Sequence, residues 1–300
     1  MALHRGQVIE FAKRLKDKVA EDDVSGASAE MAYRFFLALF PFFIFLAALS
    51  SFIASAADVQ NPTDEIMSML GDSLPEDSAA VLRTQLDGVL QQQNAGLLSI
   101  GILGAIWAAS SGVGALMKNM NRIYDVEESR RMPVRLGIAL AITVFGAGTI
   151  VIAFVILFAG QLYGPEIAGE VGLEDTAASV IGLARWPLVI AMILAAVAIM
   201  YWLAPDTEPG LKWITPGALF FGVAWIVASL GFGLYVANFG AYNETYGALG
   251  AVVVLLIWFY LTSFVLLLGA EINSVLAGMD AQEKAPPTEE ASRISQPMPR

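Results

Sequence analysis

TYGALGAVVVLLIWFYLTSFVLLLGA, residues 245–270, is a run without a single charged side chain. A helix of about 20 apolar residues crosses the ~30 Å hydrocarbon core of a bilayer, so this stretch is long enough to span a membrane. Because a chain in lipid must satisfy its own backbone hydrogen bonds, we expect the stretch to be an α-helix. A strand of a membrane barrel would be shorter and would carry a polar residue at every second position, which this stretch does not.

Five more charge-free stretches lie upstream, at 35–57, 95–117, 136–165, 186–205 and 213–243. They belong to a chain of 300 residues with 57% hydrophobic and 15% charged residues and a mean hydropathy of +0.64. Soluble proteins average about 25% charged residues. The sequence therefore predicts an all-α, multi-pass membrane bundle with six transmembrane helices, near 35–57, 95–117, 136–160, 181–204, 214–237 and 246–270.

The basic residues predict the orientation of these spans, because Lys and Arg concentrate in cytoplasmic loops. Of the 17 Lys and Arg residues, all except Arg83 and Arg185 fall in the two termini, the second loop and the fourth loop. Both termini are therefore predicted to be cytoplasmic. The segments on the other side are acidic, which accounts for much of the net charge of −11.

The chain divides into a cytoplasmic N-terminal segment 1–34, a transmembrane domain 35–277 and a cytoplasmic tail 278–300 that we expect to be disordered. Apolar positions at helical spacing in 7–20 predict an amphipathic helix, which either lies on the anionic leaflet or packs on the protein's own loops. The largest external loop, 58–94, is predicted to form two short amphipathic helices.

The composition excludes several chemistries. The chain has no Cys, so disulfides, thiol nucleophiles and Cys-ligated metals are excluded, and its one His, His4, lies near the start. A net charge of −11 argues against binding to nucleic acid, which needs a basic face. No P-loop is present, so we expect no ATP coupling within the chain. We expect no enzymatic activity, no catalytic residues, no metal and no cofactor.

Polar residues gather at the predicted cytoplasmic ends of the first, second and sixth spans. They are Glu30, Arg34, Lys118, Asn119, Asn121, Glu271 and Asn273. Glu30 and Arg34 are four residues apart and so share one face of a helix. If the three ends meet in space, these residues line an inward-facing site for an ion, a proton or a lipid head group. Alternatively, they are interfacial anchors that pair with one another and with lipid phosphates.

A second candidate site lies at the predicted external mouth, just before the last span. Tyr242, Glu244 and Tyr246 place a carboxylate between two aromatic rings, an arrangement that suits gating or binding at the mouth. The alternative is an aromatic belt at head-group level combined with the capped start of a helix.

Five segments of the chain form a specific combination: AYRFFLALFP (32–41), WAASSG (107–112), NMNRIY (119–124), YGALG (246–250), and WFY with GAEIN (258–260 and 269–273). Their order and spacing, from about residue 25 to 277, resemble the YihY/BrkB family of bacterial inner-membrane proteins. Arg34 departs from the pattern, because we expect an uncharged residue there in many relatives.

The resemblance implies a six-helix protein of the bacterial plasma (inner) membrane whose biochemistry is not settled. The family has carried a ribonuclease label, one branch is named for virulence and serum resistance, and relatives have been linked to lipid export. Phosphodiester hydrolysis needs clustered metal ligands or a His-based acid–base pair, which this chain lacks, so we reject the ribonuclease interpretation.

Two functions remain. The first is transport of a lipid or another amphipathic envelope substrate, with membrane lipids as partners. The second is a non-transporting envelope or scaffold protein that recruits an envelope protein partner through the acidic loop 58–94. A lipid-modifying enzyme has less support, because no nucleophile–base pair is visible.

Overall fold

The computed structural model describes residues 5–56, 95–162, 175–207, 215–237 and 248–284, together with Met67 and Arg83. Its helices are α1 (Arg5–Glu21), α2 (Val24–Ala56), α5 (Ala95–Ile123), α6 (Met132–Leu162), α8 (Asp175–Leu203), α9 (Pro216–Ala237) and α11 (Ala248–Lys284). All regular secondary structure in these residues is helical, which confirms the predicted all-α class for them. The predicted external helices of 58–94 and the outer mouth at Tyr242, Glu244 and Tyr246 lie outside the described residues.

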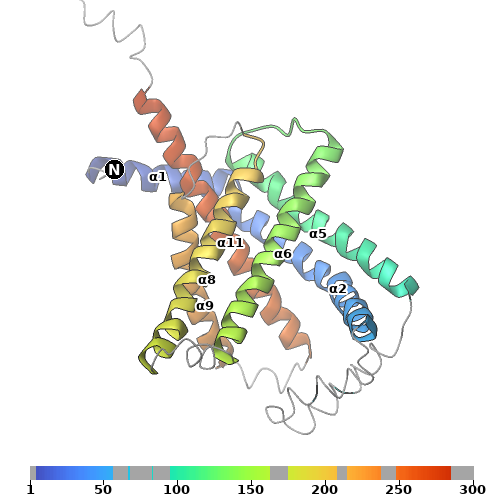
Figure 1. The fold of residues 1–300 in the computed structure, drawn as a ribbon. Helices are drawn as coiled ribbons and strands as arrows, with labels where there is room; N and C mark the ends of the chain where they lie inside the picture. Colours follow the sequence, from blue (N-terminus) through green and yellow to red (C-terminus); the bar gives the residue numbers. More distant parts are fainter. Residues whose placement is uncertain are drawn as a thin grey trace, which may run out of the picture.

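Six long helices form a closed ring of neighbours. α5 packs on α6, α6 on α8, α8 on α9, α9 on α11, α11 on α2, and α2 on α5. Figure 1 shows α2 and α5 running side by side on one side of the molecule, with α8 and α9 side by side on the other. Because α11 also contacts α5, the last helix joins the two sides.

Four helices in the described part of the chain are long and apolar enough to cross a bilayer. Their apolar segments are Met132–Leu157, Leu183–Leu203, Pro216–Ala237 and Gly250–Gln282, with mean hydropathies between 2.0 and 2.7. They coincide with the last four predicted spans, so the multi-pass membrane character is confirmed. The other two predicted spans, 35–57 and 95–117, correspond to α2 and α5, of 33 and 29 residues, and the total of six spans stays a prediction.

The buried core lies at one end of the bundle, where α2 begins and α5, α8 and α11 end. We call this the core end. Its largest fully buried apolar side chains are Met31, Leu116, Met117, Met120, Ile123 and Leu267. By contrast, α9 is buried only near its start, and Leu230 and Leu234 farther along are 67% and 69% exposed. Such a large exposed apolar surface is typical of contact with a membrane.

Three helices extend past their predicted spans at the core end. α2 begins at Val24, α5 ends at Ile123 and α11 ends at Lys284. Part of the tail predicted to be disordered from residue 278 is therefore helical, through Lys284. The helix continues because Ile272 and Val275 remain buried and no proline occurs before Pro286.

Helices α9 and α11 touch backbone to backbone at the core end. A Cβ atom on Gly217 would lie 1.9 Å from the Gly269 carbonyl oxygen, so only glycine fits at this crossing. Beside it, the hydroxyl of Tyr201 at the end of α8 donates a hydrogen bond to the Leu266 carbonyl oxygen at 2.6 Å. Small residues allow such close helix contacts in membrane bundles.

Helix α1 is the predicted amphipathic helix and makes contacts of two kinds. It packs against α11 and α2, and Val19 near its end reaches the buried core. Val8 and Ile9 in its first half stay exposed. The last turns thus pack on the protein itself, whereas a leaflet contact of the first half stays a prediction.

Candidate functional site

A group of four side chains joins α2 to α5 near the core end, and we call it the α2–α5 cluster: Glu30, Arg34, Ser111 and Lys118. Arg34 donates from Nε and Nη2 to Oε1 of Glu30 at 3.1 and 2.9 Å, and from Nη1 to Oγ of Ser111 at 2.9 Å. Lys118 Nζ lies 3.3 Å from the other Glu30 oxygen, Oε2. Two cations thus share one carboxylate, and the cluster has an excess of positive charge.

The α2–α5 cluster is exposed on its Lys118 side. The Lys118 side chain is 59% exposed, whereas Glu30 is 30% exposed. Burial raises the pKa of the Glu30 carboxyl, but the hydrogen bonds from Arg34 and Lys118 outweigh burial and hold that pKa below its usual range. Glu30 therefore stays ionised at neutral pH, and the spare positive charge is a stable property of the cluster.

A carboxyl pair, Asp22 and Glu271, lies between the α1–α2 corner and α11. Glu271 is completely buried, and neither of its carboxylate oxygens has a hydrogen-bond partner among the described residues. Asp22 is 5% exposed and lies within interaction range of Glu271, without a hydrogen bond of normal geometry between the two. Two buried acids thus face each other where a bare negative charge is poorly solvated.

The cations near the carboxyl pair are engaged elsewhere. Lys18 Nζ is 2.9 Å from Oδ2 of Asp125, which follows α5, but 4.0 Å from Oδ2 of Asp22. The hydrogen bond to Asp125 raises the pKa of Lys18. Arg122 donates to the backbone oxygen of Asp22 at 3.1 Å and not to its carboxylate.

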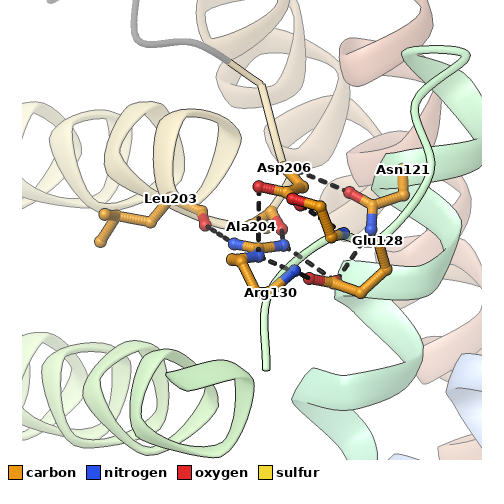
Figure 2. Close-up of polar contacts among 7 residues, drawn as sticks. Asn121, Glu128, Arg130, Leu203, Ala204 and Asp206 are labelled. Carbon is orange, nitrogen blue, oxygen red and sulfur yellow. Dashed lines mark hydrogen bonds and ion pairs between the residues drawn. The ribbon is translucent and has the colours of Figure 1, made fainter. Parts of the chain in front are cut away.

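A third polar group, the α5–α8 cluster, ties the loop after α5 to the end of α8 (Figure 2). Its side chains are those of Asn121, Glu128, Ser129, Arg130 and Asp206. Arg130 donates from Nη1 to the Leu203 carbonyl oxygen at 3.2 Å and from Nη2 to that of Ala204 at 2.9 Å. A cation here satisfies carbonyl groups that a helix leaves open at its end.

The acidic members of the α5–α8 cluster are fully provided with donors. Glu128 accepts from Nε of Arg130 at 2.7 Å and from Nδ2 of Asn121 at 2.9 Å, and Asp206 accepts from the Ser129 hydroxyl at 2.6 Å. The hydrogen bond from Arg130 lowers the pKa of Glu128, and those from Ser129 lower the pKa of Asp206. This hydrogen-bonding pattern is typical of a rigid structural connection, here between the loop after α5 and the end of α8.

Two of the predicted inner-site residues take other roles in the structure. The Oδ1 atom of Asn273 accepts a hydrogen bond from the Gly217 backbone at 2.8 Å, and its Nδ2 donates to Thr215 Oγ1 at 3.1 Å, so Asn273 caps the start of α9. Asn119 is buried, and its Nδ2 has no partner among the described residues.

The family model for virulence factor BrkB matches residues 15–294, which include all the long helices. The chain belongs to the virulence factor BrkB family. The resemblance to the YihY/BrkB family predicted from the sequence is thereby confirmed.

This BrkB-family chain is similar to several bacterial proteins. The ribonuclease-like protein YfkH of Bacillus subtilis is 34% identical over 269 residues, which cover 89% of this chain and 94% of the relative. A UPF0761 membrane protein of Alteromonas mediterranea is 28% identical over 92% of this chain and 89% of its own length. One of Alkalilimnicola ehrlichii is 29% identical over 90% of this chain, which spans 58% of that relative. No solved structure matches the chain.

The predicted inner site of this BrkB-family protein is thus divided among separate groups. Glu30, Arg34 and Lys118 come together in the α2–α5 cluster, whereas Asn121 belongs to the α5–α8 cluster and Glu271 faces Asp22. Arg34, which departs from the family pattern we expect, is paired with Glu30.

Sequence reasoning missed Asp22, Glu128, Arg130 and Asp206. Asp22 lies outside every predicted span, yet its position directly after the amphipathic segment 7–20 marks a corner between two helices. No local pattern predicts that Arg130 meets the end of α8, because its partners Leu203 and Ala204 lie more than 70 residues away in the chain.

Proposed function

We propose that this protein is a six-span transporter of the bacterial inner membrane, with both termini in the cytoplasm, that moves a lipid or another amphipathic envelope substrate. Membership of the BrkB family, four helices suited to crossing a bilayer and the two further long helices support this proposal. The distribution of Lys and Arg supports this orientation, in which the core end is the cytoplasmic side.

The α2–α5 cluster is the observation that carries the proposal. It places an exposed lysine and a half-buried arginine at the core end, next to the predicted interface between membrane and cytoplasm. One carboxylate balances both positive charges. The phosphate oxygens of a lipid head group bind Arg and Lys through charge-assisted hydrogen bonds. We infer that Lys118 meets the head group first and that the group then competes with Glu30 for Arg34.

The proposal assigns no enzymatic activity to the protein. One His, no Cys and a net charge of −11 support this assignment, because they leave few groups for hydrolysis and no basic face for RNA. The ribonuclease-like name belongs to the relative YfkH.

The test is translocation of a labelled anionic phospholipid by the purified full-length protein in liposomes. We expect Lys118→Ala and Arg34→Ala to lower the initial flux about tenfold, since one charge-assisted contact is worth at least about 1.4 kcal/mol. Arg131→Ala removes one exposed positive charge at the same end without touching the cluster, so its flux should match the wild type.

Wild-type flux equal to that of empty vesicles would contradict transport. In that case, crosslinking of an envelope protein to the acidic loop 58–94 would support the scaffold function instead. Equal loss of flux in Arg131→Ala and Lys118→Ala would contradict the assigned head-group site, because overall charge would then explain both.

A further inference from the structure

Among the described charged side chains, only Asp22 and Glu271 are buried, and both are acids. They come from distant parts of the chain, the α1–α2 corner and α11. Burying two ionised carboxylates together is unfavourable twice over, because each loses its hydration and the two repel each other. Structures resolve this conflict by a bound cation, a bound proton or a paired basic side chain.

The charged and titratable groups that the structure describes around the pair leave Glu271 without a basic partner. Those near it are Lys18, Glu21, Arg122, Tyr124 and Asp125. Lys18 hydrogen-bonds Asp125 at 2.9 Å and reaches Asp22 only at 4.0 Å, and Arg122 donates to the Asp22 backbone oxygen. Burial raises the pKa of Tyr124 to about 12, so this neighbour is neutral at physiological pH.

We propose that Asp22 and Glu271 form a proton-binding site, in which one proton is held between the two carboxyl groups and passes to cytoplasmic water as the pH rises. Binding one proton leaves a single negative charge on the pair, and a short shift of Asp22 lets the protonated acid donate to the ionised one. The unpaired oxygens of both side chains are the acceptors that this hydrogen bond needs. Burial also raises the pKa of the Asp22 carboxyl, while Lys18 opposes that change.

The position of Asp22 gives proton release a structural consequence. Asp22 and Asp23 form the short connection between α1 and α2, and Asp23 has a left-handed backbone, with φ of 47°. After release, repulsion between the two carboxylates acts on this connection between α1 and α2. The site exists whether or not the protein transports a lipid, so it goes beyond the proposed function.

Infrared difference spectroscopy between acidic and alkaline pH on the detergent-purified full-length protein tests the site. The C=O stretch of a protonated carboxylic acid should disappear from the wild type as the pH rises. Asp22→Asn should move this change to lower pH, because it removes the repulsion between the two acids, and the double variant Asp22→Asn/Glu271→Gln should lack the change. Glu127→Gln is the matched control, because Glu127 is an exposed acid in the loop after α5, and this variant should retain the change in full.

Retention of the signal in the double variant, or an unchanged titration in Asp22→Asn, would overturn the proposal, as would loss of the signal in Glu127→Gln. Repeating the titration with sodium or choline as the buffer cation separates a proton from a metal ion. A signal that depends on sodium at constant pH would mean that the pair binds a metal cation, and this outcome would also overturn the proposal. If one variant does not fold, the other carries the test.

Discussion

The α5–α8 cluster and the Asp22–Glu271 pair lie at the same end of the bundle, but their acids differ in hydrogen bonding. In the cluster, Glu128 and Asp206 accept hydrogen bonds from Arg130, Asn121 and Ser129. In the pair, Glu271 is more deeply buried and has no donor among the described residues. A satisfied polar group stabilises one structure, whereas an unsatisfied one is a place where a proton or an ion changes the structure.

The largest effect should come from breaking the satisfied cluster. Arg130→Met removes two hydrogen bonds to the end of α8 and leaves Glu128 without its cation, so we expect a loss of about 2–3 kcal/mol of stability. Thermal unfolding of the detergent-purified protein measures this loss. Arg131→Met, an exposed neighbour, should unfold like the wild type, and equal destabilisation by both variants would contradict the role of Arg130.

Replacing a member of the carboxyl pair by Met should change stability in the opposite direction. Glu271→Met replaces a buried, unpaired acid by an apolar side chain of similar size, so at neutral pH we expect stability to stay equal or to rise by about 1 kcal/mol. The same unfolding assay applies. A loss as large as that of Arg130→Met would show that Glu271 has bonding partners of its own, and the contrast between the two regions would disappear.

The two regions should also respond to pH in opposite directions. Burial raises the pKa of Asp22 in the folded protein, so the stability from this proton is complete below the ordinary carboxyl pKa and is lost as the pH rises through the folded pKa. Arg130 lowers the pKa of Glu128, so that stability is present above the ordinary pKa and is lost as the pH falls. The loss of stability with rising pH should be smaller in Asp22→Asn than in the wild type, and the loss of stability with falling pH should be smaller in Glu128→Gln.

The assignment would be reversed if Asp22→Asn no longer lost stability as the pH falls, or if Glu128→Gln no longer lost stability as the pH rises. The same dependence of stability on pH in the wild type and both variants would show that other groups control it.

The smallest effect on stability should come from the α2–α5 cluster. Lys118 is more than half exposed and its ion pair with Glu30 is 3.3 Å long, so Lys118→Ala should change stability by no more than about 0.5 kcal/mol. Its flux in liposomes should nevertheless fall, as proposed above. A large change in stability would indicate that Lys118 is a structural residue.

Most of the fold could be predicted from the sequence. The last four spans agree with the apolar helices to within a few residues at most ends, because hydropathy and length alone determine whether a segment prefers lipid. The error occurred at the core end, where α11 continues to Lys284 and α2 begins at Val24. There the helices are held by packing against each other, and local composition does not report packing.

The candidate site was predicted only in part. Glu30 and Arg34 could be paired in advance because a helix places residues four apart on one face, and the structure brings Lys118 to the same carboxylate. Asp22 and Glu271 could not be paired in advance, because no periodicity relates a corner near the N-terminus to a helix near the C-terminus.

The sequence by itself determined the class of this protein: a multi-pass, all-α membrane chain of the BrkB family. Those are properties of each segment taken alone, since the transfer of a helix into lipid depends on its own side chains. Only the tertiary structure decided which polar groups are satisfied, because that depends on how helices far apart in the chain cross. The crossing of α1, α2 and α11 buries two acids together, and the joint between α5 and α8 gives two other acids the donors that they need.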